Sequence, residues 1–174
     1  MRTGKIKLKW WQMALLSVAV SILGKIAGGK SSEDEETVYR EKFNQAPWAP
    51  PGWLFGPAWT INNFFLLLAL QDLINSEDSH YKKSLLWLQL PIWAIFFTFN
   101  YIYFNKKSTV LAAVWTKTDS VLAIISFILA MKKDKKFSWN YAPLAAWTTF
   151  ASTVADYQAL KNPDPFMKTK ALLQ

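Results

Sequence analysis

Long apolar stretches alternate with short polar segments along the 174-residue chain. Asp, Glu, Lys and Arg are absent from residues 10–24, 43–71, 84–105, 120–131 and 137–155. A helix on a globular protein needs a polar face toward water, so uncharged runs of this kind indicate helices that cross a membrane. The pattern predicts five spans, at residues 10–27, 53–74, 84–104, 109–131 and 140–160. Each is long enough to cross a hydrocarbon core of about 30 Å.

These spans predict an all-α membrane protein, a bundle of five transmembrane helices that forms one domain over residues 1–174. Backbone groups in lipid must be hydrogen-bonded within the protein, which leaves helices and closed barrels as spanning structures. Barrel strands would show alternating segments of about ten residues, which this sequence lacks. The first span follows a basic tail, as in a signal peptide, but apart from residues 24–29 no cleavage site of small residues stands out. A retained helix is therefore favoured.

The long connection between the first two spans, residues 28–52, is too charged and too rich in proline to cross a membrane. It contains the acidic run Glu33-Asp34-Glu35-Glu36. Two interpretations are open for this segment. It is either a solvated linker or a lid over one mouth of the bundle, and its length is typical of a functional loop.

Composition removes several classes of site. The chain has no Cys and one His, which excludes thiolate chemistry, disulfides and Cys- or multi-His-bound metals, so no metal site and no catalytic residue are expected. The net charge of +8 comes from basic residues at both ends of the predicted spans. This distribution fits anionic lipid headgroups better than a nucleic-acid partner, and it favours a cytoplasmic N-terminus only weakly.

Two segments carry the most specific pattern. Residues 47–60 read PWAPPGWLFGPAWT, in which the paired prolines extend the chain just before the second span. The first two tryptophans suit the membrane interface, whereas Trp59 lies deeper and one turn beyond Phe55. Residues 141–151, in the fifth span, read YAPLAAWTTFA.

Both segments resemble the TspO/MBR family of tryptophan-rich sensory proteins and translocator proteins, the peripheral benzodiazepine receptors. The family's W-x-P-P-x-W-x-F-G-P-x-W-T run is complete here, and the second segment is similar to its fifth-helix run. The resemblance implies a five-helix bundle with a pocket that opens toward the long loop and binds tetrapyrroles such as protoporphyrin and haem, or sterol- and lipid-like ligands. By motif position it assigns ligand contacts to Phe55, Trp59, Trp147 and Ala151.

Keeping the same register through the middle of the chain adds three aromatic residues to the implied pocket, Phe96, Phe99 and Trp115. The family's usual Asn then falls on Phe96 and its usual Asp on Trp115, which predicts a pocket more aromatic and less polar than the family's. Candidate polar anchors within the spans are Asn62, Asn100 and Lys117. Lys117 either lines a cavity, where it would meet a ligand carboxylate, or snorkels toward water.

Three functions follow from these observations. The leading one is a sensor, carrier or regulator that binds a tetrapyrrole or sterol-like ligand and requires no cofactor beyond a bound porphyrin or haem. The alternatives are a structural subunit of a larger membrane complex and a light-dependent porphyrin-degrading enzyme, and an enzyme is the less favoured reading. Expected partners are membrane lipids and a homodimer or larger complex, in a bacterial envelope or mitochondrial membrane. A formal cholesterol-recognition pattern is formed by Val154, Tyr157 and Lys161.

Overall fold

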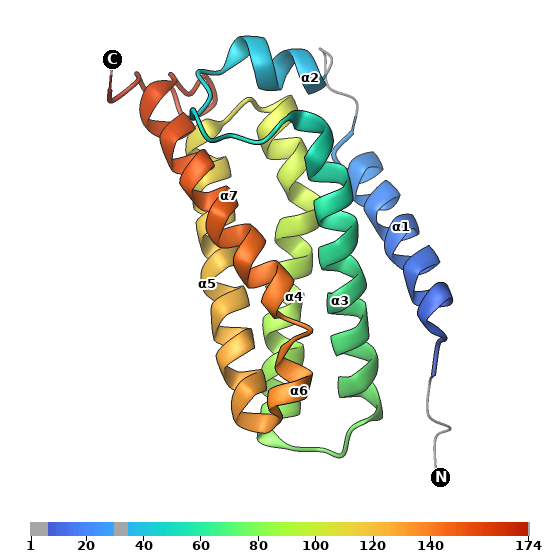
Figure 1. Cartoon of the computed structure of the whole chain (residues 1–174). Helices are drawn as coiled ribbons and strands as arrows, with labels where there is room; N and C mark the ends of the chain where they lie inside the picture. Colours follow the sequence, from blue (N-terminus) through green and yellow to red (C-terminus); the bar gives the residue numbers. More distant parts are fainter. Residues whose placement is uncertain (1–6, 30–34, 174) are drawn as a thin grey trace.

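A computed structural model of the chain describes residues 7–29 and 35–173. Five helices of 18 or more residues lie side by side in this part of the chain (Figure 1). They are α1 (Trp10–Ala27), α3 (Phe55–Asn75), α4 (His80–Asn100), α5 (Thr109–Lys133) and α7 (Ala142–Lys161). Shorter helical segments are α2 (Glu35–Thr37), η1 (Val38–Lys42), η2 (Gly52–Leu54), η3 (Tyr101–Asn105) and α6 (Lys135–Ser138).

The five long helices form a closed ring in the order α1, α3, α7, α5, α4 and back to α1. The most extensive contact in the ring is between α5 and α7. The α2 helix lies across one end of the ring, and α6 lies at the opposite end (Figure 1). The long loop after α1 is therefore placed over one end of the bundle.

Four helical segments of the described chain are long and apolar enough to cross a membrane, Trp10–Ala27, Gly52–Asn75, His80–Asn105 and Thr109–Lys133. They coincide with the first four predicted spans to within a few residues, which confirms a helical membrane protein. The α7 helix has 20 residues and occupies the position of the fifth predicted span. It is not apolar enough to meet the same criterion, so composition alone does not confirm the expected count of five spans.

The more polar composition of α7 comes from Asp156, Gln158 and Lys161 together with four Ser and Thr residues, whose hydroxyls all bond within the protein. The Thr148 hydroxyl donates to the Leu144 carbonyl at 2.7 Å, and the hydroxyls of Thr149, Ser152 and Thr153 bond to carbonyls of their own helix in the same way. Bonds of this type satisfy the hydroxyl without water. Small side chains also let two helices approach closely, which fits the extensive contact of α7 with α5.

Two clusters of buried side chains lie above and below the middle of the ring. The larger contains Leu66, Ala69, Leu73, Leu85, Ile92, Ala123, Ala130, Phe137, Tyr141 and Leu144, with Trp59 and Trp93 packed against it. The smaller contains Val38, Tyr39, Phe43, Tyr103 and Ala112, with Phe55, Phe99 and Phe104 packed against it. Of the aromatic side chains that border these clusters, Phe55, Trp59, Phe99 and Phe104 line a common cavity.

The ring closes where α1 meets α4. A Cβ atom placed on Gly24 would lie 2.6 Å from the Phe96 ring, and one placed on Gly28 would lie 2.5 Å from the Asn100 Cβ atom. Both separations are too short for real atoms, so the two glycines permit a contact that no other residue allows. This G-x-x-x-G pair therefore joins two helices of the same chain.

The segment after α7 returns to the start of α5 and is held there by one buried carboxylate. Asp164, 1% exposed, accepts hydrogen bonds from the Ser108 hydroxyl at 2.6 Å and from the Val110 N–H at 2.9 Å. Its other oxygen accepts from the Met167 N–H at 2.7 Å. A carboxylate is favourable here because the first N–H groups of a helix carry partial positive charge and lack helical partners.

Replacing this carboxylate is expected to weaken the bundle. Asp164→Ala removes the shared acceptor of one buried and two partly buried donors and should lower the free energy of unfolding by about 3 kcal/mol. Thermal unfolding in detergent, followed by circular dichroism, measures the change. Asp134→Ala is the control, because Asp134 caps α6 at an exposed position and should have a smaller effect. Equal melting temperatures for Asp164→Ala and the unmodified chain would contradict this account.

Candidate functional site

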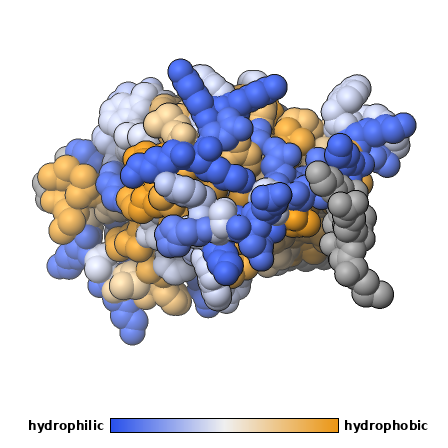
Figure 2. Space-filling view, turned by 90° about the horizontal axis from the view of Figure 1, so that it is seen from below, coloured by the Kyte–Doolittle hydropathy of each residue, from blue (hydrophilic) through white to orange (hydrophobic). Residues whose placement is uncertain are grey.

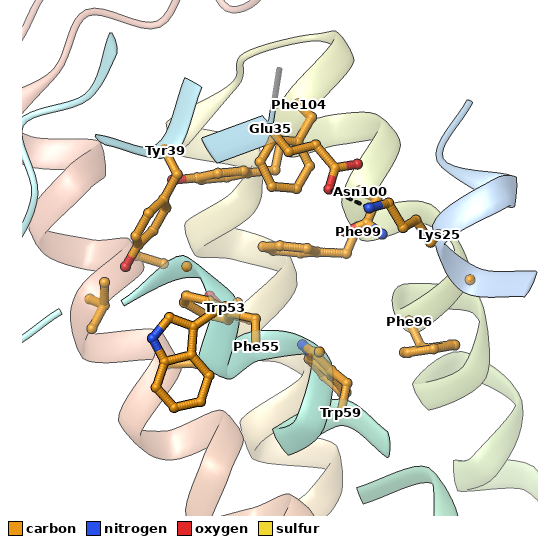
Figure 3. Close-up of a pocket in the computed structure, with 18 of the residues that line it drawn as sticks. Lys25, Glu35, Tyr39, Trp53, Phe55, Trp59, Phe96, Phe99, Asn100 and Phe104 are labelled. Atoms are coloured by element: carbon orange, nitrogen blue, oxygen red, sulfur yellow. Dashed lines mark ion pairs between the residues drawn. The ribbon is translucent and has the colours of Figure 1, made fainter. Parts of the chain in front are cut away.

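A cavity of about 460 Å³ lies at the end of the ring that α2 crosses (Figure 3). All five long helices contribute to its wall, together with α2, η1, η2 and η3. The lining includes Ser21, Gly24 and Lys25 of α1, Trp53 of η2, Phe55 and Trp59 of α3, Phe96, Phe99 and Asn100 of α4, Thr116 of α5, and Ala151, Val154, Ala155 and Gln158 of α7. The cavity therefore depends on the closed ring rather than on one pair of helices.

Eight of the residues that line the cavity are aromatic. Tyr39 meets Phe55 edge to face at a centroid distance of 5.4 Å. Phe99 stacks on Tyr103 at 5.6 Å with an angle of 12° between the ring planes. Trp59 and Phe96, 5.5 Å apart, lie toward the lower core, against which Trp59 also packs. These rings present broad apolar faces to whatever occupies the cavity.

The mouth of the cavity is polar. Lys25 of α1 and Glu35 of α2 form an ion pair, with Nζ and Oε2 at 3.4 Å (Figure 3). The Lys25 side chain is 71% exposed, so the pair lies at the rim rather than in the interior. Glu36, which also lines the cavity, pairs with Arg40 one turn along. An ion pair at such an exposed site contributes little to stability and exchanges partners readily.

The lid segment, residues 35–45, is fixed over this mouth by hydrogen bonds. The Tyr39 hydroxyl donates to the Pro50 carbonyl at 2.7 Å. The Asn44 N–H donates to the Asn162 side-chain oxygen at 2.7 Å, and the Asn162 amide returns a bond to the Asn44 carbonyl at 3.2 Å. Gln158 of α7 donates to the side chain of Gln45 at 2.5 Å. These contacts favour the lid interpretation of the long loop over the linker interpretation, although Glu33 and Asp34 of its acidic run lie outside the described residues.

Six of the ten residues singled out from the sequence line the cavity together: Phe55, Trp59, Phe96, Phe99, Asn100 and Ala151. Trp147 stands behind this wall, with its ring 5.6 Å from that of Phe55. Its indole N–H is buried and has no hydrogen-bond partner among the described residues. Trp147 therefore supports Phe55 rather than facing the cavity itself.

The other three expected residues lie away from the cavity. Trp115 donates its indole N–H to the Thr98 hydroxyl at 2.9 Å, and Lys117 pairs with Asp156 at a half-exposed position between α5 and α7. On α5 the cavity is reached by Thr116, and its two neighbours point about 100° to either side because a helix turns by that angle per residue. Asn62 is buried, and its amide nitrogen has no partner among the described residues.

Several lining residues escaped the sequence argument. Lys25 lies in the last turn of the first span, where a basic residue is ordinary, and only the position of the lid shows that it faces the cavity. Tyr39 belongs to a loop whose helical turns the sequence did not suggest.

Asp119, one turn beyond Trp115, is the buried acid of α5, so this helix is less depleted of polar groups than the register of Trp115 suggested. Val154 lines the cavity whereas Tyr157 packs on Trp48, so two of the three residues of the cholesterol pattern do not form one surface.

Comparison with known proteins gives a family match that extends over all five long helices. The sequence model of the TspO/MBR family matches residues 13–159, which include most of α1, all of α3, α4 and α5, and most of α7. A curated protein named uncharacterized membrane protein YtaB, from Bacillus subtilis (strain 168), is 27% identical over 107 residues. The aligned part covers 60% of this chain and 68% of that protein.

The Tyr39 phenol is expected to ionise at a higher pH than an unperturbed tyrosine. Burial, with a smaller contribution from Glu36, raises the pKa of Tyr39 from 10.0 to about 12. Because the folded state favours the neutral phenol, its contribution to stability is complete below pH 10 and is lost as the pH rises toward 12. The difference in tyrosinate absorbance between the unmodified chain and Tyr39→Phe should have its midpoint near pH 12. A midpoint near the ordinary value would show that the phenol is in open contact with water.

Proposed function

Because the chain belongs to the TspO/MBR family, we propose that it binds a flat tetrapyrrole in the cavity beneath the lid segment and acts as a sensor, carrier or regulator. The observation that carries the proposal is the aromatic-lined cavity with Lys25 at its mouth, the one lysine among the described residues that line it. Its volume of about 460 Å³ lies within the range of small-molecule sites. Stacking on Phe99 and Trp59 would hold a planar macrocycle without many polar contacts.

Lys25 replaces Lys117 as the residue that would meet a ligand carboxylate. A porphyrin that enters with its propionates toward the mouth would bring one of them to the Lys25 ammonium. Glu35 would then give up its pairing with Lys25, so the ammonium exchanges one carboxylate partner for another and the Glu35 carboxylate turns toward water. A sterol would fill the same apolar walls but would gain nothing from Lys25, so the charge at the mouth favours the carboxylate-bearing ligand.

The same proposal includes five membrane spans. The hydroxyls of α7 are satisfied by its own backbone, and α7 contacts both α3 and α5 in the ring. A helix enclosed in this way can cross the bilayer despite its lower hydropathy. The relative from Bacillus subtilis is named a membrane protein, which supports a bacterial envelope membrane over a mitochondrial one.

Protoporphyrin titration of the purified chain tests the proposal. Binding should quench the tryptophan fluorescence, with a reduced effect in Trp59→Phe because that indole lines the cavity. Lys25→Met should weaken binding about threefold to fivefold, the value of an ion pair at an exposed site. Glu35→Gln should strengthen binding because it frees Lys25. The matched control is Lys117→Met, a lysine outside the cavity, for which the affinity should not change.

Absence of quenching in the unmodified chain would exclude a porphyrin pocket. An equal loss of porphyrin affinity in Lys25→Met and Lys117→Met would show that net charge, rather than the lysine at the mouth, attracts the ligand.

Illumination of the complex separates the enzyme from the binding protein. Loss of the porphyrin absorbance in light, dependent on Trp59, would identify the light-dependent degrading enzyme.

A second candidate function, a subunit of a larger membrane complex, is favoured by the Lys117–Asp156 pair. The two side chains are 57% and 39% exposed on the outside of a helix pair that we place in the membrane. Charges that face lipid tails are costly, whereas the same pair covered by another subunit would be shielded and could bond to it.

The size of the protein in mild detergent tests this alternative. A complex should elute well above the 20.0 kDa of one chain, and replacing both charges in Lys117→Leu/Asp156→Leu should reduce it to the single chain. Leu90→Ala, on a different outer face, is the control. Elution of the unmodified chain as a monomer would argue against the complex.

A further inference from the structure

A second hollow lies on the outer face of the bundle, beside α4. It has a volume of about 320 Å³ and shares no lining residue with the cavity beneath the lid. Leu70 of α3 forms one side, and the rest comes from α4: Lys83, Leu86, Trp87, Gln89, Leu90 and Trp93. We call it the α3–α4 groove. Trp87 is 71% exposed and Leu90 is 59% exposed, so the groove opens to the surroundings of the ring rather than to its interior.

The groove runs along the membrane normal. Lys83 lies in the first turn of α4, and Trp93 lies ten residues further along the same helix, a distance of about 15 Å at the helical rise. This depth equals about half of a hydrocarbon core. Beyond Lys83 the side walls are apolar, so the groove has the length and the chemistry of an acyl chain in one leaflet.

The polar groups at the floor of the groove are hydrogen-bonded to each other, so an occupant does not have to bond to them. Gln89 donates its amide to the Tyr141 hydroxyl at 3.0 Å, and Trp93 donates its indole N–H to the Gln89 oxygen at 3.3 Å. Both bonds are made within the bundle. An apolar chain can therefore lie across Gln89 without burying an unpaired donor or acceptor.

Lys83 supplies a positive charge at the membrane-surface end of the groove. Its neighbour Lys82 is already engaged, with its ammonium 3.2 Å from an Asp78 oxygen and donating to the Ser76 carbonyl at 2.8 Å. Lys83 is exposed and has no ion pair within the described part of the chain. Figure 2 shows hydrophilic side chains across this end of the molecule, and α5 and α6 contribute Lys132, Lys133, Lys135 and Lys136 to it.

From this arrangement we propose that the α3–α4 groove is a binding site for an anionic phospholipid. One acyl chain lies along Leu86, Leu90 and Trp93, and the phosphate of the headgroup pairs with Lys83. A zwitterionic lipid would fill the same apolar groove, but it carries no net negative charge for Lys83 and the basic end to attract. The site is independent of the cavity beneath the lid and of any ligand bound there.

Native mass spectrometry of the full chain in mild detergent tests the site, with phosphatidylglycerol and phosphatidylcholine of identical acyl chains as probes. The unmodified chain should retain phosphatidylglycerol more tightly. Lys83→Gln should weaken its binding about fivefold, the factor that one basic side chain contributes near an anionic lipid. Lys136→Gln, which removes an exposed lysine at the same end of the molecule but outside the groove, is the matched control and should weaken binding clearly less than Lys83→Gln.

Leu90→Trp gives a second measurement, because it narrows the groove from an exposed position without altering the buried core. It should reduce retention of both lipids. Equal affinities of the unmodified chain for the two lipids, or equal losses in Lys83→Gln and Lys136→Gln, would overturn the proposal. So would a mass of two chains without lipid that returns to one chain in Leu90→Trp, since a second copy would then occupy the groove.

Discussion

The close approach of α1 to α4 is the constraint on which the cavity depends. The α1 helix has few buried side chains, because most of its apolar residues point outward. Gly24 and Gly28 bring its backbone against Phe96 and Asn100, and the Asn105 amide donates to the Gly28 carbonyl at the same end. Any larger residue at either glycine would push α1 outward. The ring would then open on the side that carries Lys25.

The end of the ring beneath the lid segment is held by polar contacts, and the opposite end is held by apolar packing. Asp164 ties the C-terminal segment to the start of α5, and the exchange between Asn44 and Asn162 ties the lid segment to the end of α7. These contacts lie outside the apolar core, so they position the mouth without filling it. The aromatic rings between the two clusters can then line a space instead of closing it.

Much of the fold follows from charge-free runs, because burial in lipid excludes charges along a whole helix. Four of the five predicted spans were confirmed by length and hydropathy, and α7 lies where the fifth was expected. The Phe55–Trp59 face was also predictable, since local helix geometry fixes it and both residues line the cavity.

Positions that depend on contacts between distant segments were not predictable. Lys25 and Tyr39 face the cavity only because the lid folds back over α1. Trp115 was placed in it by a register that had no fixed point on α5, where an error of one residue turns a side chain by about 100°. Lys117 was a candidate because a charge within a span needs a partner, and the sequence does not show which partner it finds. Lys117 on α5 and Asp156 on α7 lie 39 residues apart in the sequence, so no local pattern signals their pairing.

The hydroxyl-rich α7 has a consequence for how the protein is made. As the last long helix to leave the ribosome, it carries the weakest tendency of the five to enter lipid alone. Its broad contact with α5 offers an immediate partner that is already synthesised. Insertion of α7 therefore depends on recognition of α5 during biogenesis. The ring, and with it the cavity, is completed only after α7 has been synthesised and has joined α5.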